Sequence, residues 1–133
     1  MQTEHIRTRF EKLGLSPQDA VIVGSGVLAA LEIRESNDLD IITQRETFDT
    51  LAKSYPTASY PDGTGKIMDG DVEVMYSWLD RDYAYYSAHA TEIDGFEYIS
   101  LTELRARKLQ QGRPKDLRDV VLIDEYLATH PAV

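Results

Sequence analysis

Three acidic side chains lie on two short apolar runs that are expected to form β-strands. Asp38 and Asp40 are one residue apart in the run DLDIIT, and Glu73 lies in the run GDVEVMYSW. Because side chains alternate between the two faces of a strand, Asp38 and Asp40 project from one face while Leu39 and Ile41 project from the other. Two carboxylates this close repel each other, and solvent, a shared proton or a divalent cation relieves the repulsion.

The second acidic run repeats the alternation. Val72 and Val74 face one side, and Glu73 faces the other side together with Asp71. If the two runs pair, Glu73 approaches the two aspartates, and three carboxylates on one sheet face make an all-oxygen site suited to Mg²⁺ or Mn²⁺. Asp71 lies next to an expected tight turn and is better explained by that turn. We therefore assign the third carboxylate of the site to Glu73.

A glycine and a serine separate an earlier apolar run from a short helical pattern. Gly24 permits a sharp turn and a close approach of the backbone. Ser25 and Gly26 occupy the expected start of a helix, where free N–H groups and the helix dipole favour an anion such as phosphate. A phosphate cradle beside a carboxylate metal site is what phosphoryl or nucleotidyl transfer from a metal-bound triphosphate requires.

These motifs resemble those of the nucleotidyltransferase superfamily related to DNA polymerase beta, in particular its small stand-alone members. The resemblance covers residues 20–76 and rests on VGS at 23–25, on DLD at 38–40 and on Glu73 on a later strand; the segment GRPKDLRD at 112–119 is also similar to small members. It implies that the glycine and serine hold nucleotide phosphates and that both aspartates bind metal ions. It further implies that Glu73 helps to bind a metal and promotes deprotonation of the acceptor hydroxyl.

Three basic residues are candidates for contacts with the triphosphate. Arg34 and Lys66 could neutralise its charge, although an ordinary role as surface charges is equally open for each. Lys115 lies at the start of an expected helix, where a cation opposes the helix dipole, and such a departure from local rules often marks function. Asp116 restores the favourable sign, so a purely structural role also stays open. The expected substrate contacts are Gly24, Ser25, Arg34, Lys66 and Lys115.

Hydrophobic periodicity gives the elements that must position these residues. We expect helices at residues 3–13, 26–32, 45–54, 81–89, 100–111 and 114–128, and strands at 20–23, 38–43, 66–68, 71–78, 91–93 and 96–99. Thr3 is the expected N-cap of the first helix, Ser100-Leu-Thr-Glu103 fits a capping box, and residues 56–65 are predicted to form a loop because they hold two prolines and two glycines. This order predicts one α/β (α+β) domain over residues 1–133, with a nucleotidyltransferase-like mixed β-sheet flanked by helices.

Composition narrows the class of partner. The formal net charge is −9, with 23 acidic against 14 basic residues, so the surface repels a phosphate backbone and nucleic-acid binding is not expected. There is no cysteine, which excludes disulfides and thiolate metal sites. No apolar run approaches the roughly 18 residues of a membrane span, and the N-terminal residues lack the apolar stretch of a secretory signal. We therefore expect a cytoplasmic protein without a membrane partner.

Together these features predict a metal-dependent nucleotidyltransferase. It would use Mg²⁺ or Mn²⁺ as cofactor and an NTP, such as ATP, as substrate, and it would move an NMP to a hydroxyl of a small molecule or a protein side chain. A homodimer or a protein partner would supply the acceptor or complete its pocket. The alternative is a catalytically silent nucleotide- or protein-binding module of the same fold, for example an antitoxin-like partner. Val27-Leu28, in place of the Ala-Arg that often follows Gly-Ser in antitoxin-type members, keeps that alternative open.

Overall fold

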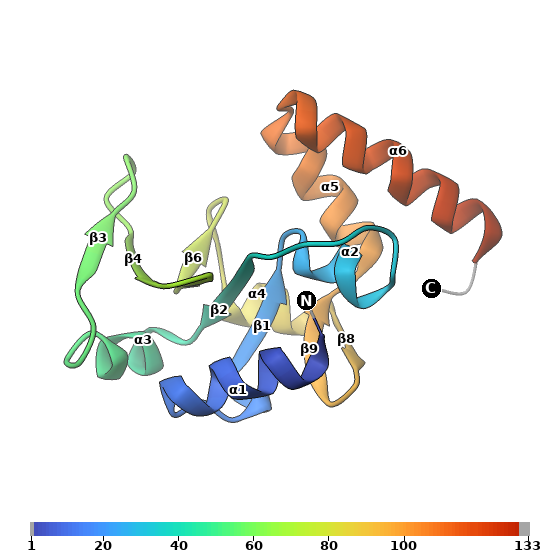
Figure 1. Ribbon diagram of the computed structural model, residues 1–133. Coiled ribbons are helices and arrows are strands. Elements are labelled where there is room, and N and C mark those ends of the chain that lie inside the picture. Colours follow the sequence, from blue (N-terminus) through green and yellow to red (C-terminus); the bar gives the residue numbers. More distant parts are fainter. Residues whose placement is uncertain (1, 131–133) are drawn as a thin grey trace.

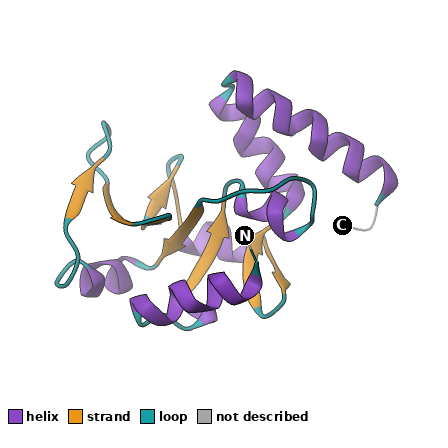
Figure 2. Ribbon diagram, viewed as in Figure 1, coloured by secondary structure: helices purple, strands orange, loops and turns teal. Residues whose placement is uncertain are grey.

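A computed structural model describes residues 2–130 of the chain. A seven-stranded mixed sheet forms its centre, and helices cover both faces (Figures 1 and 2). The strands of this sheet are β1 (Ala20–Val23), β2 (Leu39–Thr43), β3 (Thr57–Ser59), β4 (Gly65–Asp69), β5 (Val72–Met75), β8 (Ala90–Ile93) and β9 (Phe96–Ile99). The helices are α1 (Thr3–Leu13), the short 3₁₀ turn η1 (Pro17–Asp19), α2 (Gly26–Ala30), α3 (Arg45–Leu51), α4 (Tyr83–Ala88), α5 (Leu101–Gln111) and α6 (Pro114–Thr129). The predicted mixed α/β architecture is confirmed.

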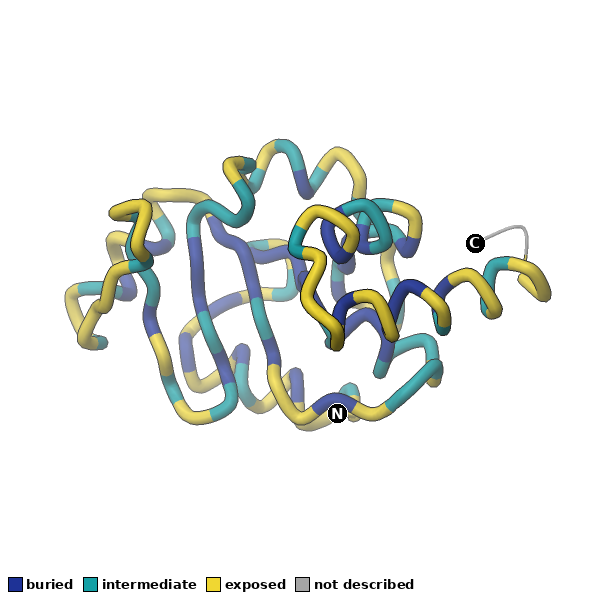
Figure 3. The backbone as a smooth tube through the Cα atoms, turned by 90° about the horizontal axis from the view of Figure 1, so that it is seen from above, coloured by how far each residue is buried: buried dark blue, intermediate teal, exposed yellow. Residues whose placement is uncertain are grey.

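The strand order places the two acidic runs side by side. The order is β3-β4-β5-β2-β1-β9-β8, and β2 pairs parallel with β5 and antiparallel with β1. All four residues of β1 are buried, as expected for a central strand covered on both faces, whose apolar run is continuous rather than alternating. Figure 3 shows the buried backbone segments in the interior of the molecule and the exposed ones around its outside.

Helices α1 and α4 lie on opposite faces of the sheet (Figure 1). Ile6, Phe10 and Leu13 recur at helical spacing on α1 and are all buried, and the ring of Phe10 packs edge-on against Phe96 of β9. On α4 the ring of Tyr86 is fully buried and its hydroxyl is satisfied by a backbone carbonyl. These aromatic residues fix the two helices against the sheet.

Helices α5 and α6 form a hairpin that stands beside one end of the sheet (Figure 1). The predicted cap is present, because the side chain of Ser100 accepts a hydrogen bond from the backbone N–H of Glu103. Helix α5 ends at Gly112 in a left-handed conformation, and Pro114 opens α6 at its first helical position. Within residues 2–130, no helix combines the length and the apolar character that a membrane crossing needs.

The prediction of a loop over residues 56–65 was wrong in part. Residues 57–59 form the edge strand β3, which pairs antiparallel with β4. All three residues are exposed and their sequence shows no apolar alternation. The strand is therefore defined only by the pairing of its backbone with β4.

Two further local predictions were wrong. The run at 71–78 is not one strand, because it breaks after β5 and the short strand β6 (Ser77–Trp78) pairs instead with β7 (Arg81–Asp82). The N-cap of α1 is Gln2 rather than Thr3. Thr3 is already helical, and its hydroxyl donates to Asp94 at 3.1 Å.

Candidate functional site

The parallel pairing of β2 with β5 sets Asp40 directly opposite Glu73. Leu39 and Val72 beside them are buried, so the two carboxylates project from the other face of the sheet. Burial of Asp40, followed by the negative charges of Glu73 and Asp38, raises the pKa of the Asp40 carboxyl from 3.8 to about 6. The structure therefore brings Asp40 and Glu73 together through the strand pairing on which the sequence analysis made their approach conditional.

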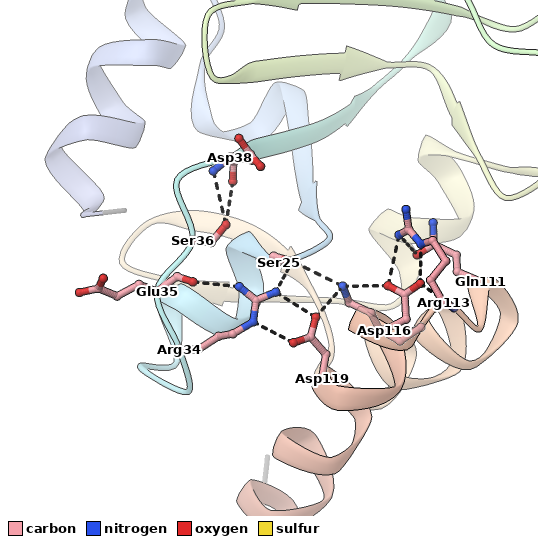
Figure 4. Close-up of polar contacts among 10 residues, drawn as sticks. Ser25, Arg34, Glu35, Ser36, Asp38, Gln111, Arg113, Asp116 and Asp119 are labelled. Carbon is pink, nitrogen blue, oxygen red and sulfur yellow. Dashed lines mark hydrogen bonds and ion pairs between the residues drawn. The ribbon is translucent and has the colours of Figure 1, made fainter.

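Asp38 lies just before β2 and is more exposed than Asp40. Its backbone N–H donates to the Ser36 hydroxyl at 3.4 Å, and that hydroxyl contacts the Asp38 carbonyl at 3.3 Å (Figure 4). Asp38 lines the same cleft as Asp40 and Glu73. Asp71 also lines the cleft, but it lies outside β5 and its carboxylate pairs with His5 and Arg9 of α1, whereas the sequence had linked it to the tight turn.

The turn after β1 lies against the Asp40 carboxylate. Gly24 has a φ of +70°, and a Cβ added there would lie 2.9 Å from Asp40 Oδ2. Both the backbone conformation and the space therefore require glycine. The next residue, Ser25, precedes α2, and its hydroxyl accepts hydrogen bonds from Arg34 Nη2 at 2.8 Å and from Lys108 Nζ at 3.4 Å (Figure 4).

A buried network of charges forms the opposite wall. Lys108 of α5 is 5% exposed, and its Nζ lies 2.9 Å from Asp119 Oδ2 and 3.4 Å from Asp116 Oδ1, both on α6. The guanidinium of Arg34 donates twice to the Asp119 carboxylate, at 2.8 and 2.9 Å (Figure 4). Burial alone would raise the pKa of Asp119, but hydrogen bonds from Arg34 and Lys108 outweigh burial and hold it below its usual value. Asp119 thus stays ionised, and the charges of this wall are paired with one another, as buried charges must be.

The basic start of α6 has a structural explanation in part. Arg113 donates from its backbone N–H and, at 2.6 Å, from Nε to the fully buried carboxylate of Asp116, which thereby caps the start of α6. Lys115 is exposed and lines the cleft. Among the side chains of residues 2–130, Lys115 takes part in no ion pair, so its charge is available to a ligand.

A cleft of about 700 Å³ separates the carboxylates from this wall. Seven residues predicted for the site line it, namely Gly24, Ser25, Arg34, Asp38, Asp40, Glu73 and Lys115. Lys66 does not line the cleft, but its Nζ lies 3.6 Å from Glu73 Oε1. All eight predicted residues therefore lie in or beside one cleft, and their roles in binding and catalysis stay predictions.

Sequence reasoning missed three residues of this cleft. Lys108 and Asp119 form an ion pair in the wall opposite the carboxylates, and the Tyr60 hydroxyl donates to Glu73 Oε1. Burial, together with that hydrogen bond and the charge of Glu73, raises the pKa of the Tyr60 phenol, so the phenol remains a donor at neutral pH. Asp119 carried a detectable signal, because it lies three residues after Asp116 on the face of α6 that also holds buried apolar residues. Nothing in the sequence around Lys108 or Tyr60 indicated their partners.

The donor set suits a divalent cation in its chemistry. Oxygen ligands are those that Mg²⁺ and Mn²⁺ prefer. The pKa of Asp40 is raised first by burial and then by the negative charges of Glu73 and Asp38, and a bound cation would offset those charges. Within residues 2–130, no three histidine or acidic side chains lie close enough together to coordinate a metal ion as they stand. The residues that could hold one are Asp40 and Glu73, which are side by side, with Asp38 from the same cleft.

Comparison with known proteins gives one solved structure of similar shape. No protein-family model and no curated protein matches the sequence. The crystal structure of a "putative nucleotidyltransferase" from Thermotoga maritima aligns with 97% of this chain and 96% of its own, with a TM-score of 0.59 and 16% sequence identity. At that identity the likeness bears on architecture, and it agrees with the mixed sheet and flanking helices described above. The chain therefore has a nucleotidyltransferase-like fold.

Proposed function

We propose that this chain is a nucleotidyltransferase that moves an NMP from an NTP to a hydroxyl of a small molecule or a protein side chain. One observation carries the proposal: Asp40 and Glu73 are paired in register against the Gly24 turn, at a cleft that is also lined by Arg34, Lys108 and Lys115. The fold agrees with it, because a structure of similar shape belongs to a protein described as a "putative nucleotidyltransferase". The nucleotide is the expected partner, and a second copy or another protein could supply the acceptor.

Each wall of the cleft would serve one part of the substrate. The turn at Gly24 and Ser25 would receive the phosphates, and Arg34, Lys108 and Lys115 would supply positive potential. Glu73 would accept the proton of the attacking hydroxyl, so catalysis would rest on positioning and charge rather than on a covalent enzyme intermediate.

A divalent cation would be held by Asp40 and Glu73 with Asp38. When bound, the cation would neutralise part of the triphosphate charge and stabilise the charge on the departing pyrophosphate. Without the cation, the carboxylates would repel the negatively charged NTP. The negative charge of Glu73 already raises the pKa of Asp40.

Nucleotide binding can be measured by thermal unfolding with ATP, GTP, CTP or UTP, each with and without Mg²⁺. At a ligand concentration one hundred times Kd, binding adds roughly 2.7 kcal/mol to the free energy of unfolding. Asp40→Asn should abolish the Mg²⁺-dependent part of the gain. Asp49→Asn makes the same chemical change on exposed α3, with 59% of the side chain accessible, and should leave the gain intact. Absence of any Mg²⁺-dependent shift with all four nucleotides would contradict the proposal.

Transfer itself is measured with labelled NTPs and candidate acceptors, by mass spectrometry for an added nucleotide and by pyrophosphate release. A catalytically silent binding module is the second candidate, and the pairing of the cleft charges favours it. Glu73 is engaged by Tyr60 and Lys66, and Arg34 is neutralised by Asp119. Stabilisation by an NTP without pyrophosphate release under any condition would select this second candidate.

A further inference from the structure

Tyr60 is held over the cleft by a closed turn at the sheet edge. The backbone N–H of Tyr60 donates to the Thr64 carbonyl at 2.8 Å, and the Tyr60 carbonyl accepts from the backbone N–H of Gly63 at 2.9 Å. Lys66 Nζ lies 4.6 Å from the centre of the Tyr60 ring, in a cation–π contact, and also reaches Glu73. The phenol is therefore fixed from its backbone and from its ring, and it lines the same cleft as the carboxylates.

The Tyr60 hydroxyl lies beside Glu73, the carboxylate that we propose as the general base. It donates to Glu73 Oε1, Glu73 is paired in register with Asp40, and Asp40 touches the Gly24 turn. Within residues 2–130, the Tyr60 phenol is the hydroxyl hydrogen-bonded to Glu73. A hydroxyl, its proposed base, a second carboxylate and the proposed phosphate turn thus form one continuous row of neighbouring groups.

We infer that Tyr60 is itself a nucleotide acceptor, so that the chain modifies its own tyrosine. This inference rests on the proposed function, because it needs an NTP in the cleft. Tyr60 Oη forms a bond to the α-phosphorus, the bond from that phosphorus to the bridging oxygen of the β-phosphate breaks, and pyrophosphate leaves. The phenolic proton passes to Glu73, and the product is a tyrosyl phosphodiester carrying one NMP. No oxidant, reductant or third reactant is needed.

The arrangement sets the stoichiometry. Once the phosphodiester forms, Tyr60 has no proton left to donate to Glu73, and the attached nucleotide remains beside the cleft. Each chain therefore accepts one nucleotide, and the reaction stops after a single turnover for every molecule.

The test compares the wild type, Tyr60→Phe and Tyr83→Phe after incubation with Mg²⁺ and each of the four NTPs. Tyr60→Phe removes only the hydroxyl. Tyr83→Phe is the matched control, because its hydroxyl donates to the carbonyl of Gln18 at 3.0 Å, away from the cleft. Intact mass and peptide mapping are expected to place one NMP on Tyr60 of the wild type and of the control, with none on Tyr60→Phe. The same adduct is expected in wild-type protein taken directly from the expressing cells, without added nucleotide.

Nucleotide binding and pyrophosphate release, measured on the same samples, separate this inference from the proposed function. If the wild type binds NTP and labels another acceptor while Tyr60 stays unmodified, self-modification is overturned and the proposed function stands. Faster labelling of an added acceptor by Tyr60→Phe, with no adduct on wild-type Tyr60, likewise overturns it and makes the phenol a gate. If no NTP binds, both fall.

Discussion

Replacement of Asp40 by asparagine tests the electrostatics of the carboxylate pair without reference to catalysis. The side chain keeps its size and can still form hydrogen bonds, but it can no longer ionise. In the wild type, burial and the charges of Glu73 and Asp38 raise the pKa of Asp40 from 3.8 to about 6. Ionised Asp40 is therefore disfavoured in the folded protein, and Asp40→Asn removes that cost.

The pKa shift sets the magnitude and the pH window. A change from 3.8 to about 6 corresponds to roughly 3 kcal/mol. Because the folded-state pKa is the higher one, the stabilising contribution of Asp40 is complete below 3.8 and is lost as the pH rises through about 6. At pH 8 without metal, Asp40→Asn should exceed the wild type by about 1–3 kcal/mol, and near pH 4 the difference should shrink toward zero.

Urea unfolding in EDTA buffers from pH 4 to pH 8 provides the assay, with the midpoint and slope fitted at each pH. Asp49→Asn is the control, because the exposed carboxylate of Asp49 pairs with Arg45 four residues earlier, and its loss should change stability by less than about 0.5 kcal/mol. Added Mg²⁺ should raise the stability of the wild type at pH 8 and leave Asp40→Asn unchanged.

One result would refute this reasoning. If Asp40→Asn is no more stable than the wild type at pH 8 while Asp49→Asn is neutral, the two carboxylates do not strain the metal-free fold. The inference that the cleft is built for a cation would then lose its physical basis.

The remaining predictions concern the two walls of the cleft. Asp119→Ala leaves Arg34 and Lys108 without their shared carboxylate, so urea unfolding should show a loss of about 3–5 kcal/mol in the free energy of unfolding. The control Asp124→Ala removes an exposed partner of an arginine on α5 and should cost less than about 1 kcal/mol. Equal losses for the two variants would argue against a buried network. Gly24→Ala places a Cβ 2.9 Å from the Asp40 carboxylate at a residue with positive φ, so we expect about 1–3 kcal/mol of destabilisation. The Mg²⁺-dependent stabilisation by NTP in thermal unfolding should also be lost. If that stabilisation is unchanged, this turn is not part of the phosphate site.

The sequence by itself determined the local geometry of the acidic runs. The two-residue period of a strand placed Asp40 on the face away from Leu39, and burial of Leu39 at 1% exposure confirms that assignment. The limits of α5 were also readable, because caps act over three or four residues, as at Ser100 and Gly112. These features depend only on neighbours along the chain.

The tertiary structure alone decided which charges meet. Whether Glu73 approaches Asp40 depended on the parallel pairing of two strands that are separated by a helix and a hairpin. The edge strand β3 carries no apolar pattern, and its pairing places Tyr60 over the carboxylates. Lys108 meets Ser25 across 83 residues of sequence, and a buried lysine gives no sign in the sequence of the carboxylates that will neutralise it. Periodicity and capping are local, whereas the pairing of charges is fixed by the packing of elements distant in sequence.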